Sequence, residues 1–142
     1  MREEIIMKKI LIAFDASEHS YKTVEFTKNL INNLKEKPES IELISVIQVI
    51  DLPEIPENQS LISYYKKYYK EKHEEIIKEN PEFKSVILIG NVANEIINYA
   101  KEHNIDLIIV GKTGKSKLEQ FLLGSVSKKI VDHAPCNVLI VN

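Results

Sequence analysis

Short apolar runs along this chain alternate with segments in which apolar residues recur every three or four positions. The first run, Ile10–Phe14, is apolar at both odd and even positions, which is typical of a strand covered on both faces. Similar runs predict four more strands, at residues 41–47, 83–89, 107–110 and 137–141. Residues 1–8 are mixed in character and form a ragged start that the fold does not require.

Helical spacing predicts a helix in each interval between two of these strands. Ser17 or Ser20 is placed to cap the first helix, and Asn91 or Asn94 the third. The second helix is expected over residues 60–78, after a loop at 51–58 that contains two prolines. The residues expected to face the core are Val24, Phe26, Thr27, Leu30, Ile31 and Leu34; Leu61, Tyr65, Tyr68 or Tyr69, and Ile76; Ala93, Ile96, Ile97 and Ala100; and Val126, Ile130 and Val131.

The alternation of strand and helix defines the expected fold class. It predicts one α/β domain over residues 1–142, with a five-stranded parallel sheet, helices on both faces and right-handed crossovers. Ligands of such sheets bind outside the carboxyl ends of the strands, where the strand order reverses. Asp15, Val46, Gly90 and Gly111 fall at those ends.

Glycines mark the segment 106–129, which contains three of the four glycines of the chain. Gly111 and Gly114 form one turn after the fourth strand, and Gly124-Ser125-Val126-Ser127 opens the last predicted helix. Backbone N–H groups in the first turn and a helix N-terminus with hydroxyls in the second are able to close on one anion. On spacing alone, a phosphate site and a purely structural pair of turns are equal alternatives.

The same segment spells the end of a P-loop twice, as Gly-Lys-Thr at 111–113 and as Gly-Lys-Ser at 114–116. A P-loop also requires a glycine five residues before the glycine of this tripeptide. That position holds Asp106 for the first match and Ile109 for the second. The P-loop interpretation therefore fails, and any phosphate site here must be of another kind.

Composition and charge narrow the class of protein. The chain has 142 residues, of which 44% are hydrophobic and 28% charged, as expected for one globular domain. A net charge of −2 and a pI near 6.1 argue against nucleic acid as a partner. The single cysteine, Cys136, allows no disulfide within the chain, so we expect a reducing cytoplasm. Because no apolar run approaches the length of a membrane span, we expect no membrane association.

The pattern Gly111-x-x-Gly114, nine residues, Gly124-Ser125 resembles the nucleotide-binding signature of the universal stress protein family. Other landmarks match in order across nearly the whole chain: Lys9–Ile12 leading to Asp15-x-Ser17, Leu43–Val46, Gly90-Asn91-Val92, Asp106–Gly111 and His133–Val141. The resemblance implies an ATP-binding, Rossmann-like domain with strand order 3-2-1-4-5, usually a homodimer.

Carried over by position, the resemblance also implies a role for each candidate residue. Asp15 would lie near the ribose or a phosphate-bound Mg²⁺, and the backbone of Val46 would meet the adenine edge. The residues expected along the ribose and phosphates are Gly111, Gly114, Gly124, Ser125, Val126 and the hydroxyl of Ser127. The chain departs from the family pattern at Ser45, where a histidine is frequent, and at Val92, where a proline is frequent.

Three functions follow as hypotheses. The leading one is a nucleotide-responsive regulatory module of the stress response that binds ATP, with Mg²⁺ as an optional companion, and has no dedicated catalytic activity. The second is a slow ATPase or phosphotransferase that uses Asp15 or His19. The third is a ligand-free protein that acts through dimerisation and an unidentified protein partner. The apolar run 138–141 would form a sheet edge, and pairing it with a second copy predicts a homodimer.

Several of these residues have a purely structural alternative. Asp15 is also suited to capping the turn that follows it. His73, His103 and His133 are expected at helix surfaces or helix ends, and scattered histidines make no zinc site. The tyrosines at 64, 65, 68 and 69 are flanked by lysines and glutamates, which favours a solvated helix with one packed face over an RNA-binding surface.

Overall fold

The computed structural model describes residues 7–48, 56–112 and 123–142, with the backbone alone at 56–58. Its strands are β1 Lys9–Ala13, β2 Ser40–Ile47, β3 Phe83–Ile89, β4 Leu107–Gly111 and β5 Asn137–Val141. They pair in parallel in the order β3-β2-β1-β4-β5. The parallel sheet and the strand order 3-2-1-4-5 are therefore confirmed, as is the Rossmann-like fold class.

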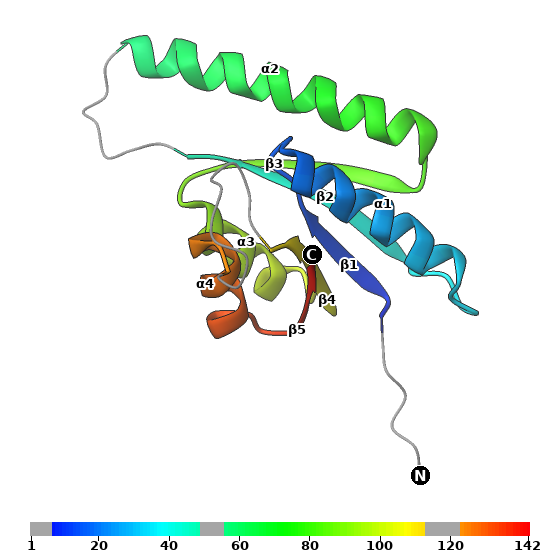
Figure 1. The fold of residues 1–142 in the computed structure, drawn as a ribbon. Coiled ribbons are helices and arrows are strands. Elements are labelled where there is room, and N and C mark those ends of the chain that lie inside the picture. The colour runs from blue at the N-terminus through cyan, green and yellow to red at the C-terminus, as the bar shows by residue number, and fades with distance from the viewer. Residues whose placement is uncertain (1–6, 49–55, 113–122) are drawn as a thin grey trace.

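Helices cover both faces of the sheet. α1, Glu18–Asn32, and α2, Pro56–Glu79, lie on one face, whereas α3, Val92–Glu102, and α4, Ser125–His133, lie on the other (Figure 1). β2 and β4 flank β1 on opposite sides, so the chain leaves β1 toward one neighbour and later returns to the other. This reversal of direction is where a ligand site is expected in such a sheet.

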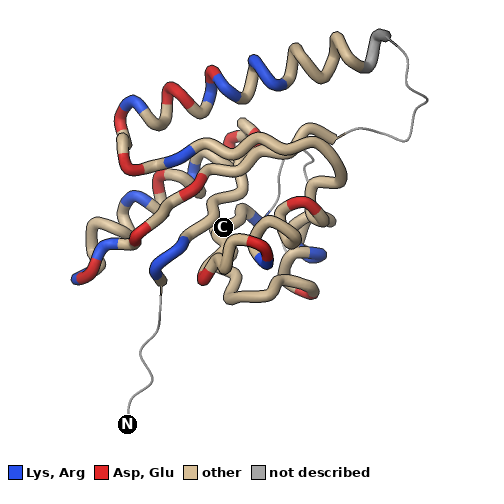
Figure 2. The backbone as a smooth tube through the Cα atoms, turned by 180° about the vertical axis from the view of Figure 1, so that it is seen from behind, with Lys and Arg blue, Asp and Glu red and all other residues tan. Residues whose placement is uncertain are grey.

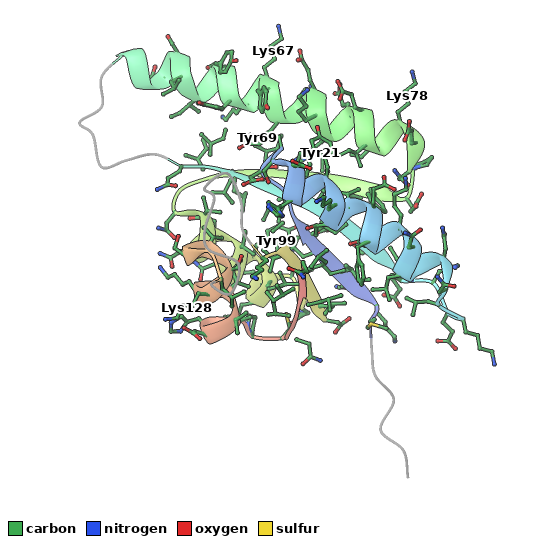
Figure 3. The ribbon with its side chains drawn as sticks, in the orientation of Figure 1. Tyr21, Lys67, Tyr69, Lys78, Tyr99 and Lys128 are labelled. Carbon is green, nitrogen blue, oxygen red and sulfur yellow. The ribbon has the colours of Figure 1, made fainter. Side chains whose placement is uncertain are left out.

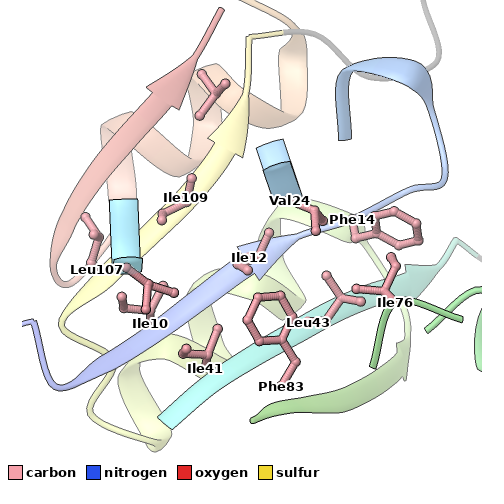
Figure 4. Packing of buried hydrophobic residues seen from close by; sticks show 12 residues of the cluster. Ile10, Ile12, Phe14, Val24, Ile41, Leu43, Ile76, Phe83, Leu107 and Ile109 are labelled. Atoms are coloured by element: carbon pink, nitrogen blue, oxygen red, sulfur yellow. The ribbon is translucent and has the colours of Figure 1, made fainter. Parts of the chain in front are cut away.

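The strands are apolar at both odd and even positions because each face of the sheet carries its own core. Ile10 and Ile12 belong to the cluster beneath α1 and α2 (Figure 4), while Leu11 belongs to the cluster beneath α3 and α4. All three side chains are fully buried. The central strand is thereby held from both sides, which makes its carboxyl end a firm base for a site.

Side-chain caps set the starts of two helices. The Ser17 hydroxyl oxygen accepts a hydrogen bond from the Ser20 amide (3.2 Å), and the Asn91 side chain accepts one from the Asn94 amide (3.0 Å). Both cap residues have extended backbone angles, as N-caps require. Of the two candidates at each start, Ser17 and Asn91 are therefore the caps.

The structure corrects the predicted extent of α2 and of three apolar stripes. The loop expected at 51–58 is wrong for 56–58, because α2 begins at Pro56; residues 51–55 lie outside the described part. Proline suits the first helical position, because a backbone N–H there would have no acceptor within the helix. Leu61 was expected to face the core but is 53% exposed. Phe26 and Val131 were also expected to face it but are 42% and 45% exposed. Their positions lie at the margin of a stripe that is narrower than predicted.

The long helix α2 has one packed face and one solvated face, as expected. Tyr69 is buried on the side that faces the sheet, whereas Lys67 and Lys78 point away from it (Figure 3). Basic and acidic residues are interspersed along the described part of this helix (Figure 2). Within the described ranges, no helix combines the length and apolar character needed to span a bilayer.

Candidate functional site

A cavity of about 530 Å³ lies at the carboxyl ends of β1, β2 and β4; we call it the strand-end cavity. Its described lining includes seven of the eight predicted site residues: Asp15, Val46, Gly111, Gly124, Ser125, Val126 and Ser127. Gly114 lies outside the described residues. Segments separated by about 110 positions in the sequence thus border one cavity, while the role of each residue toward a ligand stays a prediction.

The turn between β1 and α1 brings Asp15 to the cavity. One carboxylate oxygen of Asp15 accepts a hydrogen bond from the Ser17 amide at 2.9 Å, so the capping interaction considered from the sequence is present. Ala16 between them has a φ of 63°, in the left-handed region that a residue with a Cβ rarely adopts. Asp15 therefore closes the turn and lines the cavity at the same time.

Phe14, just before this turn, is held to the neighbouring strand by backbone and side-chain bonds. Its amide donates to the Ile44 carbonyl (2.9 Å), and its carbonyl accepts from the Ser45 hydroxyl (2.6 Å). These bonds extend the attachment of β1 to β2 by one residue beyond the strand. The backbone entering Asp15 is therefore anchored to the sheet.

His73 of α2 completes a buried polar chain behind this turn, contrary to the expectation of a surface histidine. It is 0% exposed; its Nε2 lies 2.7 Å from the Ser45 hydroxyl oxygen and its Nδ1 lies 2.6 Å from that of Ser85. Because Ser45 uses its hydrogen on the Phe14 carbonyl, Nε2 must carry a proton and donate to Ser45. In the neutral ring that burial favours, Nδ1 accepts from Ser85.

Burial reinforces that neutral state. Removal of the imidazole from water lowers the pKa of His73 from 6.5 to about 4, since burial disfavours the charged form. The sequence offered no clue to this role, because the two serines lie far from His73 along the chain. The contact exists only once α2 packs on β2 and β3.

The start of α4 forms another side of the cavity. Gly124 is the N-cap, without a side-chain cap, and its own amide donates to the Lys112 carbonyl at 2.9 Å. Ser125 is exposed at the first helical position. Because the first amides of a helix have no partner within it, this end carries partial positive charge. The arrangement suits an anion.

Ser127 ties this helix to the end of β4. Its hydroxyl is buried and donates to the Gly111 carbonyl at 2.7 Å. A phosphate oxygen would need the same hydrogen, so a contact from Ser127 to phosphate requires this bond to break. The predicted phosphate role of Ser127 stays a prediction, and its role in the structure as described is to hold α4 against Gly111.

The third side of the cavity comes from α2, which was not predicted to contribute to a site. Leu61, Tyr65 and Tyr69 line the cavity at successive four-residue intervals. This spacing places them on one face of the helix. The periodicity had shown that the face is apolar, but it could not show that the N-terminal half of the helix reaches beyond the sheet.

Comparison with known proteins decides the family. The sequence model of the universal stress protein family matches residues 7–142. The chain belongs to the universal stress protein family. The matched range includes the whole described part of the chain, and with it all described walls of the strand-end cavity.

Curated universal stress proteins match over a shorter part of the chain. One from Methanothermobacter thermautotrophicus is 46% identical over 65 residues, or 44% of this chain and 44% of that protein. Universal stress protein MJ0531 of Methanocaldococcus jannaschii is 47% identical over 55 residues, or 39% of this chain and 32% of that protein. The chain thus spans less than half the length of these two relatives.

Solved structures extend the likeness to the whole fold. Hypothetical protein MJ0577 is 27% identical with a TM-score of 0.78, and the match covers 96% of each chain. A universal stress protein in complex with cAMP has 17% identity, a TM-score of 0.67 and coverage of 96% and 99%. One from Archaeoglobus fulgidus in complex with dAMP has 18% identity, a TM-score of 0.66 and coverage of 98% and 100%. This universal stress protein therefore shares its fold with two proteins that hold adenine nucleotides.

Proposed function

We propose that this universal stress protein binds an adenine nucleotide, ATP foremost, in the strand-end cavity and serves as a nucleotide-responsive regulatory module. The observation that carries the proposal is the convergence of Asp15, Gly111 and the N-terminus of α4 on one cavity of about 530 Å³. That volume is typical of small-molecule sites. The complexes of two fold neighbours with cAMP and dAMP support adenine nucleotides as the ligand class.

In this proposal the phosphates lie at the start of α4. Its free amides and helix dipole favour an anion, and Gly124 has no side chain to hold a phosphate away from the backbone. Ser125 and Val126 belong to the same first turn and line the cavity. Gly111 has the equivalent place at the end of β4, and we assign Gly114 to the same turn from its sequence position alone.

The nucleoside occupies the part of the cavity between β1 and β2. Asp15 faces the ribose there, and the backbone of Val46 at the end of β2 meets the adenine edge. Both assignments come from the family resemblance, and both residues lie near the reversal of strand order between β2, β1 and β4. The site therefore needs no P-loop.

Mg²⁺ fits this site as a companion of the phosphates. As the alternative to its ribose contact, the Asp15 carboxylate would be a hard oxygen ligand of the kind that Mg²⁺ prefers. Across the described ranges no group of three or more His, Cys, Asp or Glu side chains is arranged for a metal, so phosphate oxygens and water complete the shell in the proposal. The bound ion would neutralise phosphate charge.

We infer a binding module rather than a dedicated enzyme. Phosphoryl transfer requires a group that orients the nucleophile and charge that stabilises the transition state. Asp15 is the one acidic side chain in the described lining, where it also closes the turn to Ser17, and His19 does not belong to that lining. The competing ATPase hypothesis predicts turnover well above background that Asp15→Ala abolishes without loss of ATP affinity.

Ligand analysis of the purified protein tests the proposal. Mass spectrometry should find adenine nucleotide retained by the wild-type chain, and calorimetry should measure ATP binding to the chain freed of it. Ser125→Glu places a negative charge at the exposed first position of α4, which favours the helix but repels phosphate. We expect ATP affinity to fall at least about tenfold, equivalent to about 1.4 kcal/mol.

Ser125→Gln is the matched control, because it has nearly the size of glutamate and no charge. Its ATP affinity should stay within about threefold of wild type, or about 0.7 kcal/mol. If the Glu and Gln variants bound ATP with equal affinity, the phosphates would not lie at the start of α4. A wild-type chain that binds no adenine nucleotide would overturn the proposal and favour the ligand-free alternative.

The proposal includes a homodimer formed through β5. This strand lies at the edge of the sheet, beside β4, and Val138, Leu139 and Ile140 on it are only half-buried. Pairing with a second copy would satisfy the hydrogen-bonding groups of an open edge. Sedimentation at micromolar concentration should give the mass of a dimer, and a monomer would contradict this part of the proposal.

A further inference from the structure

A single face of α2 changes its surroundings along the length of the helix. Leu61, Tyr65, Tyr69, His73 and Ile76 follow one another at intervals of four or three residues. His73 and Ile76 are buried against the sheet, and Tyr69 is only 4% exposed, but Leu61 is 53% exposed. The sheet-facing stripe thus continues past the sheet and lines the strand-end cavity.

The aromatic members of this stripe rest on a fixed support. His73 is bonded through both ring nitrogens to serines of β2 and β3. Its ring packs against Phe14 with 5.6 Å between centroids, and the Tyr69 ring lies 6.4 Å from it. Tyr65 continues the series, stacked on Tyr69 with 6.4 Å between centroids and 30° between planes. The two tyrosine rings are therefore oriented by the core beneath them.

The cavity has two chemically different ends. One end is formed by Gly111 and the first turn of α4, whose first backbone amides have no partner within the helix. The other is formed by the end of β2 and by Leu61, Tyr65 and Tyr69 of α2, where apolar and aromatic surface predominates. β2 and β4 lie on either side of β1, so the two strands that border these ends are about 10 Å apart. A ligand that fills both must be anionic at one end and flat and apolar at the other.

We propose that Tyr65 and Tyr69 form an aromatic wall that contacts the base of the bound nucleotide and makes the site selective for purines. This inference rests on the proposed nucleotide function and adds to it the determinant of base selectivity. Contact between a base and an aromatic side chain contributes about 1–3 kcal/mol. A purine offers more flat surface to the wall than a pyrimidine, and inorganic polyphosphate offers none.

Calorimetry with three probes tests the wall: ATP, CTP and inorganic triphosphate, each with the full chain. Tyr65→Leu is the main variant, because Tyr65 is half-buried and its loss leaves the core beneath Tyr69 in place. Tyr64→Leu is the matched control: the same change one residue away, at a side chain that is 62% exposed and absent from the described lining. Thermal unfolding of each variant verifies that it is folded.

We expect Tyr65→Leu to weaken the affinity for ATP about 5- to 100-fold, which is equivalent to about 1–3 kcal/mol. Its affinity for triphosphate should stay within about twofold, and its preference for ATP over CTP should shrink. Tyr64→Leu should leave the affinities for ATP, CTP and triphosphate unchanged. Because the chain has no tryptophan, tyrosine emission gives a second readout, and ATP should quench it less in Tyr65→Leu than in Tyr64→Leu.

The outcomes separate this inference from the function on which it rests. If the wild-type chain binds none of the probes, the proposed function fails and the wall fails with it. If wild type binds ATP but Tyr65→Leu and Tyr64→Leu behave alike, only the wall is overturned. Equal weakening of ATP and triphosphate by Tyr65→Leu would also overturn it, because the tyrosine would then support the cavity without contacting the base.

Discussion

The Nε2 atom of His73 lies 2.7 Å from the hydroxyl oxygen of Ser45, at the buried contact between α2 and β2. Ser45 stands where the family frequently has a histidine. In this protein the position holds a serine, and the imidazole that contacts it comes from α2. Through Ser45 the contact reaches the Phe14 carbonyl, one residue before Asp15. One hydrogen-bonded chain thereby connects α2, which carries the proposed aromatic wall, to the turn that carries the Asp15 carboxylate.

The first prediction concerns the pH dependence of stability. The pKa of His73 is lowered to about 4 in the folded protein, below the ordinary 6.5. Between these values the unfolded chain binds more protons, so stability falls as the pH drops from 6.5 to 4. The His73 contribution to this loss is about 3 kcal/mol. Urea denaturation across this pH range should show a shallower dependence for His73→Gln than for wild type.

A destabilised variant that keeps the imidazole provides the control for this experiment. Ile76→Val shortens a buried side chain on the same face of α2 and should cost about 0.5–1.5 kcal/mol at every pH. It should therefore retain the wild-type pH slope. If His73→Gln retains that slope too, His73 is not the group responsible.

A second prediction separates the two serines that hold His73. Ser45 is buried, and Ser45→Ala leaves both the Phe14 carbonyl and the His73 N–H without their partner. An unsatisfied buried polar group costs about 1–3 kcal/mol, so the variant should lose at least that much in urea denaturation. Ser85 is exposed, and Ser85→Ala should cost about 1 kcal/mol or less because water replaces the hydroxyl. Equal losses from the two variants would contradict the buried hydrogen-bonded chain through Ser45.

The parts of the fold that could be predicted are those with a local signal. Burial on both faces makes Ile10–Ile12 apolar at every position, and this pattern located the strands and hence the ends where Asp15 and Gly111 lie. The strand order was implied only by the family resemblance. Periodicity alone specifies a parallel sheet but not which strands are neighbours.

The parts that could not be predicted depend on contacts between segments distant in sequence. Nothing near His73 indicates that serines of β2 and β3 will meet both of its nitrogens. The bond from Ser127 to the Gly111 carbonyl likewise needs the packed position of α4. Helical spacing identified the apolar face of α2, but the contribution of Tyr65 to the cavity follows from how far that helix extends past the sheet.

A third prediction concerns Gly90, at the turn between β3 and α3. Its φ of 149° is rarely adopted by a residue with a side chain, and an added Cβ would lie 2.6 Å from the Glu95 Oε1 atom. We expect Gly90→Ala to lower the free energy of unfolding by about 1–3 kcal/mol, measured in urea. In a Glu95→Ala background the steric contact disappears, so the loss remaining there reports the backbone conformation alone. Wild-type stability of Gly90→Ala would contradict the described turn.

The last prediction uses the other departure from the family pattern, Val92. This residue is the first of α3, where a backbone N–H has no partner within the helix, so proline removes no helical bond. Asn91 before it has a φ of −77° and a ψ of 126°, the extended conformation that a residue preceding proline favours. Val92→Pro should therefore stabilise the protein by about 0.4–1 kcal/mol, because it restricts the unfolded chain more than the folded one. Proline at Ala93, a buried position one residue further into the helix, is the contrasting variant and should destabilise, because the residue before a proline disfavours the helical conformation that Val92 adopts. A loss of stability in Val92→Pro as large as that in Ala93→Pro would show that α3 begins earlier than Val92.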